Sequence, residues 1–204
     1  MSATATRSRG RPRSFDEEVV LDALTALFWQ QGYEATSLSD IVETSGLNKS
    51  SLYNAFGSKQ ELFALVLNRY INARIEMLTG LVDAAGDGID GLHTFLDAIK
   101  AEVDSEFGRQ GCLAVNTSAE VGRSDAAIKD FGQHYRDRMR AALLQVVGSA
   151  SAKNSLDQSL IDQRADMLLV FMLGMSVAVR GGAEDAEIDR LFSSAHAIIE
   201  SWRD

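Results

Sequence analysis

The sequence predicts an all-α fold, in which an N-terminal three-helix helix-turn-helix domain is followed by a larger helical domain. Apolar residues recur at spacings of three and four almost throughout, which is the period of a helix and not of a strand. The chain of 204 residues contains a single proline, Pro12, so little interrupts such helices. With 46% hydrophobic residues, the chain can bury a sizeable core.

Four helix starts are marked in the first 60 or so residues. Three of them show a serine followed three residues later by an acid, as in a capping box: Ser14 with Glu17, Ser37 with Asp40, and Ser58 with Glu61. Asn48 marks the fourth start as an N-cap. The expected helices are 15–31, 38–45, 49–56 and 58–84. Because Gly46 permits a tight turn, the two short helices form a helix-turn-helix candidate.

Glycine-rich and polar segments divide the rest of the chain into five further helices. We expect them at 89–107, 112–122, 125–147, 156–180 and 186–202, with Ser155 and Gln158 as a capping pair. The loop that contains Gly86, Gly88 and Gly91 matches the dinucleotide fingerprint G-x-G-x-x-G. That motif needs a strand before it, and the preceding residues are helical in pattern. The loop is therefore interpreted as a helix-helix connector, and no cofactor is expected.

Several classes of protein are disfavoured by composition. The single cysteine, Cys112, excludes an internal disulfide, and the three histidines, His93, His134 and His196, lack the spacing of a zinc site. Residues 1–14 lack the apolar core of a secretory signal. The most apolar stretch, 167–179, is shorter than the roughly 20 residues of a membrane helix. We expect a cytoplasmic protein without a bound metal and without membrane attachment. The sequence contains no recognisable nucleophile motif, so we do not expect an enzyme.

The charge is distributed unevenly along the chain. A net charge of −9 argues at first against nucleic acid, because DNA affinity depends on neutralising phosphates. Residues 1–14, however, carry Arg7, Arg9, Arg11 and Arg13 and no acid. Residues 71–204 carry 13 basic and 21 acidic side chains, so the excess acid lies away from the N-terminus. The first 14 residues are predicted to form a flexible basic arm.

The predicted helix 49–56 divides into an apolar and a polar face. Leu47, Leu52 and Phe56 can pack inward, against Ile41 and Phe28. The side chains left outside are polar and lie near the helix start, where helix-turn-helix proteins contact bases: Asn48, Lys49, Ser50, Tyr53 and Asn54. A bidentate contact of Asn54 with adenine is one expectation. From the residues alone, a solvated polar face fits equally well.

Residues 11–70, about a third of the chain, closely resemble the DNA-binding domain of the TetR/AcrR repressor family. The carrying segments are G-R-P-R at 10–13, F-W-Q-Q-G-Y-E-A-T-S at 28–37, I-V-E-T-S-G-L at 41–47, S-L-Y-N-A-F-G-S-K at 51–59, and L-F at 62–63. The resemblance implies that Tyr53 and Lys59 bind phosphates and that Thr36 and Ser37 meet the DNA backbone. At position 57 this chain has glycine where the family often has proline, and at position 50 it has serine where the family often has glycine. Neither difference removes a side chain that is expected to contact DNA.

Together these observations predict a set of DNA-binding residues. They are Arg7, Arg9, Arg11, Arg13, Thr36, Ser37, Asn48, Lys49, Ser50, Ser51, Tyr53, Asn54 and Lys59. The expected partner is a double-stranded, palindromic operator, because dimers read two half-sites. The alternative from another class is a helical module whose helix-turn-helix docks a partner protein. The arginine arm favours DNA.

The resemblance further implies a homodimeric repressor released from DNA by a small-molecule or electrophile inducer. Residues 15–57 would form the DNA-binding domain, and 58–204 a ligand-binding and dimerisation domain that opens with a connecting helix. Candidate pocket residues are Phe95, Phe107, Cys112, Asn116, Tyr135, Met139, Phe171 and Met175. Candidate dimer residues, from the last two helices, are Met167, Phe171, Leu191, Phe192, Ala195 and Ile199.

Cys112 supports two interpretations. It follows Gly111 at a predicted helix start, where the helix N-terminus and Arg109 would favour the thiolate. The segment R-Q-G-C-L-A-V-N also resembles that of a TetR subgroup in which some members respond to electrophiles or oxidants. The competing interpretation is a buried, inert cysteine that acts as a small hydrophobic side chain.

Overall fold

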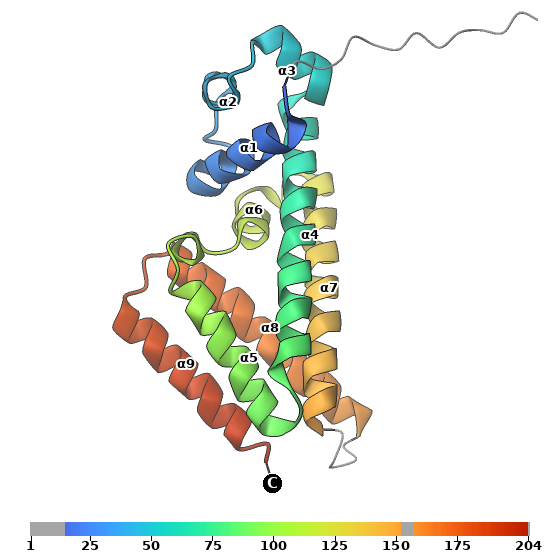
Figure 1. Cartoon of the computed structure of the whole chain (residues 1–204), viewed down its shortest axis with the longest axis vertical. Coiled ribbons are helices and arrows are strands. Elements are labelled where there is room, and N and C mark those ends of the chain that lie inside the picture. The colour runs from blue at the N-terminus through green and yellow to red at the C-terminus, as the bar shows by residue number, and fades with distance from the viewer. Residues whose placement is uncertain (1–14, 152–156, 204) are drawn as a thin grey trace, which may run out of the picture.

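All regular structure in the described residues is helical, which confirms the all-α prediction. The computed structural model describes residues 15–151 and 157–203. The helices, drawn in Figure 1, are α1 (Glu17–Gln31), α2 (Leu38–Ser45), α3 (Lys49–Phe56), α4 (Lys59–Ala85), α5 (Gly88–Val103), α6 (Leu113–Val121), α7 (Ala126–Ser151), α8 (Gln158–Arg180) and α9 (Asp185–Glu200). A short 3-10 helix, η1 (Gly108–Gln110), precedes α6.

The two short helices of the helix-turn-helix have the predicted bounds, because local capping fixes both ends. Ser37 and Asp40 form a complete capping box at α2, and the α2 C-cap Gly46 has a left-handed φ of 65°. The Asn48 side chain accepts from the Ser51 backbone N–H at 2.9 Å and so caps α3. Sequence signals within three residues of each end therefore suffice here.

Of the three other predicted caps, one is confirmed, and an aspartate holds the N-cap position at the other two helices. Ser58 and Glu61 form the capping box of α4, as expected. The N-cap of α1 is Asp16, not Ser14, because the Asp16 carboxylate already accepts from the Glu18 N–H at 3.0 Å and aspartate caps as well as serine. Asp157 occupies the N-cap position of α8. Ser14 and Ser155 lie outside the described residues.

The N-terminal domain is held together by aromatic packing between α1 and α4. Phe28 is fully buried, and its ring centroid lies 4.8 Å from that of Phe63 in an edge-to-face arrangement. Ile41 of α2 and Leu52 of α3 are buried in the same core. The helix-turn-helix therefore packs against the first turns of α4.

Removal of the α3 cap should weaken this domain measurably. Asn48→Ala leaves the N–H of Ser51 without its side-chain acceptor, and N-cap losses of this kind cost about 1 kcal/mol. Urea denaturation should detect that loss. The matched control is Asn54→Ala, an exposed asparagine on the same helix that caps nothing. Equal unfolding free energies for the two variants would contradict the capping role.

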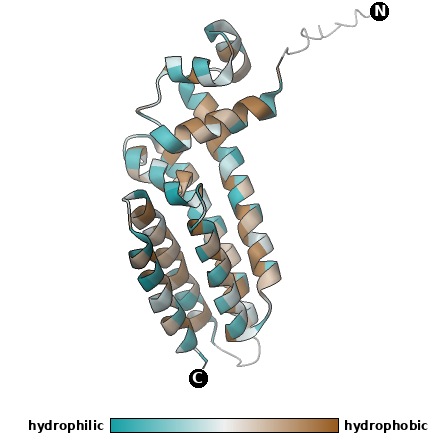
Figure 2. Cartoon of the chain, turned by 60° about the vertical axis from the view of Figure 1, so that its left-hand side comes forward, coloured by the Kyte–Doolittle hydropathy of each residue, from teal (hydrophilic) through white to brown (hydrophobic). Residues whose placement is uncertain are grey.

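The long helices α4 and α7 run side by side and form the spine of the larger domain (Figure 1). Helices α5 and α8 pack against α7, and α9 covers α5. Figure 2 shows hydrophobic and hydrophilic residues on every long helix, as expected when each helix buries one face. No helix in the described residues combines the length and apolar character needed to span a membrane.

Two helix boundaries in this domain differ from the predictions. Helix α5 ends at Val103 and not near 107, because the chain turns so tightly at Gly108 that a Cβ there would collide with the Glu102 carbonyl. Helix α7 continues to Ser151, four residues beyond its predicted end. Gly86 and Asp87 join α4 to α5, whereas Gly88 is the first residue of α5 and Gly91 lies within that helix. Gly86 and Gly88 have positive φ angles. The expected helix-helix connector is therefore present but shorter than predicted, because two of the three glycines belong to α5.

Part of the predicted dimer interface lies inside the protomer. Phe192, Ala195 and Ile199 of α9 are at most 2% exposed, so they offer no surface to a partner. The reason is that the apolar stripe of α9 packs onto α5 of the same chain. Met167, Phe171 and Leu191 are half-buried, and the Phe171 ring meets the Phe192 ring edge-on at 5.3 Å.

Two histidines that are 103 residues apart in sequence meet between α5 and α9. The Nδ1 atoms of His93 and His196 lie 2.7 Å apart, and their rings are stacked. Nε2 of His93 contacts Glu200 and Nε2 of His196 contacts Asp97, each at 3.0 Å. Hydrogen bonds from Arg203 and His93 lower the pKa of Glu200 to about 2. This network holds α9 against α5. Within the described residues, no group of three or more His, Cys, Asp or Glu side chains is placed to bind a metal ion.

Candidate functional site

Helix α3 lies at one end of the molecule, and the C-terminus lies at the other (Figure 1). Leu52 and Phe56 are buried on its inner side. Tyr53 is 44% exposed on the outer side, and Ser50 and Asn54 are also exposed. The predicted division of this helix into an inner and an outer face is therefore present.

Lys49 supplies the positive charge of this face. Its ammonium lies 5.9 Å from the centroid of the Tyr53 ring, one helical turn away. Lys49 is the only basic residue between positions 15 and 57, against seven acids. A surface so poor in positive charge needs additional cations to hold a DNA backbone. The four arginines of the predicted arm, Arg7, Arg9, Arg11 and Arg13, lie outside the described residues.

Three of the predicted contact residues have their polar side-chain atoms already engaged. Thr36 is fully buried, and its hydroxyl donates to the Gly32 carbonyl at 2.6 Å, so its side chain cannot reach DNA. Ser37 and Asn48 are exposed but accept backbone hydrogen bonds as N-caps. The predicted approach of Thr36 to the DNA backbone is therefore left to its main chain, because its hydroxyl is used in the turn before α2. Ser51 is half-buried on α3.

Lys59 opens α4 close to the turn between α1 and α2. Its ammonium lies 4.7 Å from the centroid of the Tyr33 ring and 3.5 Å from the Glu34 carbonyl oxygen. Partial burial lowers the pKa of Lys59, and the nearby carboxylates of Glu120, Glu34 and Asp40 oppose that shift. The Lys59 ammonium is therefore positioned by the Tyr33 ring and the Glu34 carbonyl, between α4 and the start of α2.

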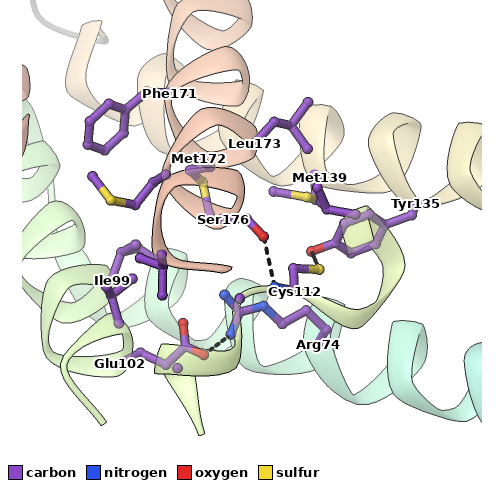
Figure 3. A pocket seen from close by; sticks show the side chains of 16 residues that line it. Arg74, Ile99, Glu102, Cys112, Tyr135, Met139, Phe171, Met172, Leu173 and Ser176 are labelled. Carbon is purple, nitrogen blue, oxygen red and sulfur yellow. Dashed lines mark hydrogen bonds and ion pairs between the residues drawn. The ribbon is translucent and has the colours of Figure 1, made fainter. Parts of the chain in front are cut away.

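A second feature is a cavity in the larger domain, lined by α4, α5, α6, α7 and α8 (Figure 3). Its volume is about 40 Å³. Five of the predicted pocket residues line it: Cys112, Tyr135, Met139, Phe171 and Met175. Asn116 lines a separate cleft between α1 and α6, and its amide donates to the Gln110 carbonyl at 3.0 Å.

Two aromatic residues predicted for the pocket do not line this cavity. Phe95 is 1% exposed and belongs to the packed core of α5. Phe107 is 61% exposed, because α5 ends before it and the following turn carries it outside, where its ring centroid lies 6.2 Å from that of Trp29. The assignment of Phe107 assumed that α5 continues to residue 107, whereas that of Phe95 rested on an apolar helix face that packs into the core instead.

The cavity is lined by a half-buried ion pair that the sequence did not indicate. The guanidinium of Arg74 on α4 contacts Glu102 Oε1 on α5. Burial alone would lower the pKa of Arg74, but the hydrogen bond and charge of Glu102 raise it above its usual value. A signal was present in the sequence: Arg74 lies on the apolar stripe that includes Ile71, Ile75 and Leu78. A charge on such a stripe indicates a buried partner.

Cys112 is the N-cap residue of α6 and forms part of the cavity wall. It is 6% exposed, and its Sγ donates to the Tyr135 hydroxyl at 3.2 Å. Burial, together with the neighbouring Cys112, raises the pKa of Tyr135 well above its usual value. Arg109, which was expected to favour a thiolate, instead pairs with Asp185 at 2.6 Å. The burial of Cys112 favours the interpretation as a small core residue.

The cavity wall is hydrogen-bonded to α1 of the N-terminal helices. The Trp29 indole N–H donates to the carbonyl of Gly111, the neighbour of Cys112, at 3.0 Å. The Arg180 guanidinium, one turn from the cavity residue Ser176, donates to the α1 carbonyls of Trp29 and Gln30 at 3.2 and 3.3 Å. These bonds connect α1 to both η1 and α8.

Helix α6 also contacts the segment that leads into α2. The carboxylate of Glu120 accepts from the backbone N–H groups of Tyr33 and Glu34 at 3.0 and 2.7 Å. In Figure 1, α6 lies between α1 and the lower helices of the larger domain. Helix α6 is therefore hydrogen-bonded directly to the segment that leads into the helix-turn-helix.

Comparisons with known proteins agree with this architecture. Residues 20–66 match the model of the bacterial regulatory proteins of the tetR family. The chain is 46% identical over 177 residues to the transcriptional repressor BdcR of Escherichia coli, covering 87% of this chain and 85% of BdcR. It is 29% identical over 198 residues to the repressor ComR of the same species, covering 96% and 93% of the two chains.

Solved structures show the same fold. A cysteine mutant of the TetR-family regulator CifR, complexed with 26-base-pair operator DNA, superposes with a TM-score of 0.80 at 25% identity, covering 94% of this chain and all of that one. The reduced form of NemR from E. coli superposes with a TM-score of 0.73 at 24% identity, covering 90% and 94%. With the identity to BdcR over most of both sequences, these comparisons show that the chain belongs to the TetR family of bacterial regulatory proteins.

Proposed function

We propose that this protein is a DNA-binding transcriptional repressor that inserts α3 into the major groove of its operator. The exposed polar face of α3, with Tyr53 and Asn54 outside and Leu52 inside, carries this proposal. Residues 15–57 are the proposed DNA-binding domain, and the chain from Ser58 onward is the proposed ligand-binding and dimerisation domain. The kinship with proteins named as repressors and with a regulator bound to operator DNA supports this function.

The contacts within the interface have different proposed roles. Tyr53 and Lys59 bind phosphates, which positions the domain without reading sequence. Asn54 and Lys49 read base edges, since an amide can pair bidentately with adenine and an ammonium can bind guanine. The arm arginines 7, 9, 11 and 13 supply most of the positive charge and enter the minor groove, as homeodomain arms do.

The proposed assembly is a homodimer formed through α8 and α9. Val170 and Val177 on α8 are 69% and 57% exposed, and Gly174 lies between them on the same face. Ile198 on α9 is 44% exposed. An apolar groove beside Val170 and Val177 is lined by side chains from α6, α7 and α8. A two-fold axis through this face would bury these side chains against their copies.

The proposed inducer occupies the cavity beside Cys112 and shifts the balance between two conformers. A ligand releases DNA only to the extent that it binds the conformer with mismatched half-site spacing more tightly. The hydrogen bonds from Trp29 and Arg180, and those to Glu120, join the cavity walls to α1 and to the segment before α2. They are the proposed route by which ligand binding reorients α3.

A salt titration of operator binding tests the DNA-binding proposal. The operator is first selected from genomic fragments by the full-length protein. Tyr53→Ala and Lys59→Ala should weaken binding to all duplexes alike, and Lys59→Ala should reduce the log-log salt slope by about 1. Asn54→Ala should also relax base preference, because a bidentate base contact contributes about 1–3 kcal/mol of discrimination.

The outcome that contradicts this assignment is an identical specificity profile for all three variants. Ser39→Ala is a suitable control, since Ser39 is exposed on α2 and has no proposed role at the interface. A slope near zero for the wild type would mean that phosphates are not contacted. The helix-turn-helix would then serve as a docking module for another protein.

A further inference from the structure

The carboxylate of Glu102 has an unused hydrogen-bond acceptor at the cavity. Its Oε1 pairs with Arg74, while Oε2 is buried and has no hydrogen-bond partner among the described residues. Figure 3 shows one oxygen of Glu102 linked to Arg74 and the other directed away from it. An acceptor that is buried without a donor is unfavourable, so a molecule that donates to it gains affinity.

The charge balance of the cavity argues against a charged ligand. Arg74 and Glu102 neutralise each other, and the remaining polar groups, on Cys112, Tyr135 and Ser176, are hydrogen-bonded to one another or to the backbone. A net charge added beside this pair would lose its hydration without gaining a counter-ion. The acceptor therefore favours a neutral hydroxyl.

The remaining walls are apolar and adaptable. Three methionines, Met139, Met172 and Met175, line the cavity together with Ile99 and Phe171. Methionine side chains repack readily around ligands and contact aromatic rings favourably. Such walls fit a flat apolar body attached to the hydroxyl.

The cavity is too small to admit such a ligand without moving its walls. Its volume of about 40 Å³ compares with about 150 Å³ for an engineered protein cavity that binds benzene. A ring must therefore displace lining residues, which belong to the same helices that are bonded to α1. A ligand larger than the cavity would therefore move helices that are hydrogen-bonded to α1, and so would also move the DNA-binding domain.

We infer that the ligand of this cavity is a small, neutral, phenol-like molecule whose single hydroxyl donates to Glu102 Oε2. The inference rests on the proposed function only in calling this ligand the inducer, because binding is measurable without DNA. Arg74 acts as a positioning residue that holds the carboxylate in place.

Two isomeric probes test the inference by calorimetry on the full-length protein. 4-Ethylphenol has the hydroxyl donor, whereas 4-methylanisole has the same formula and no donor. The wild type should bind 4-ethylphenol at least tenfold more tightly. Glu102→Gln should reduce that preference to less than threefold. Glu106→Gln, an exposed acid four residues away, is the matched control and should preserve it.

A second variant is needed if Glu102→Gln fails to fold because it leaves Arg74 without its counter-ion. Arg74→Met combined with Glu102→Met replaces the pair by apolar side chains of similar length, which proteins often tolerate. It should bind the two isomers equally.

Three results would overturn the inference. The first is equal affinity of the wild type for the two probes, and the second is a preference for 4-ethylphenol that the double variant retains. The third is that neither probe binds at 1 mM, roughly the weakest affinity of interest. None of them affects the salt titration, which is performed without ligand and tests the DNA-binding function separately.

Discussion

Val170→Asp combined with Val177→Asp should convert the protein to monomers and lower operator affinity at least 100-fold. Both valines are more than half exposed in the protomer and lie on one face of α8. In the proposed dimer each aspartate would be buried without a counter-ion, which costs several kcal/mol. A loss of about 3 kcal/mol corresponds to roughly a 100-fold change in affinity. Light scattering reports the mass, and a duplex titration reports the affinity.

The control for this variant is Val19→Asp. Val19 is 64% exposed on α1, so the same substitution is made at an equally accessible valine away from α8. It should leave the mass measured by light scattering unchanged. A dimer that persists in the double α8 variant would place the interface elsewhere on the surface.

The helix-turn-helix could be predicted residue by residue because its determinants are local. The Ser37–Asp40 box and the Asn48 cap fix the starts of α2 and α3, and Gly46 fixes the turn between them. Each of these groups acts within three residues of the helix end. The same reasoning failed for α5, whose end depends on the close approach of Gly108 to the Glu102 backbone, a constraint of the tertiary fold.

The cavity could be predicted only in part, since its residues come from five helices. Periodicity placed Tyr135 and Met139 on the buried face of α7, and both line the cavity. It did not indicate that Arg74 and Glu102, 28 positions apart, meet there. Pairing across helices depends on their packing and register, which a pattern within one helix does not encode.

The apolar stripe of α9 shows the limit of a single-sequence argument most clearly. Phe192, Ala195 and Ile199 have the spacing of a buried helix face, and that expectation is met. The pattern cannot distinguish a core of the same chain from an interface with a second copy, because both remove the same apolar area from water. The exposed side chains of α8 and α9 give the better indication of a partner surface.

Phe28→Ala should destabilise the protein by about 3–5 kcal/mol, the range for truncating a buried phenylalanine. Phe28 is fully buried, and its ring packs edge-on against Phe63 of α4 at a centroid distance of 4.8 Å. The deletion leaves a cavity between α1 and α4, the two helices that support the helix-turn-helix. Since small domains are stable by only about 5–15 kcal/mol, operator binding should also fall.

Urea denaturation of Phe28→Ala beside Phe107→Ala makes this test specific. Phe107 is 61% exposed, and its loss should change the unfolding free energy by less than about 1 kcal/mol, as surface substitutions generally do. The slope of the transition should be unchanged if both variants unfold in one step. Equal destabilisation by the two substitutions would mean that the contact between Phe28 and Phe63 does not hold α1 on α4. The position of α3 would then depend on the hydrogen bonds that Trp29 donates and Glu120 accepts instead.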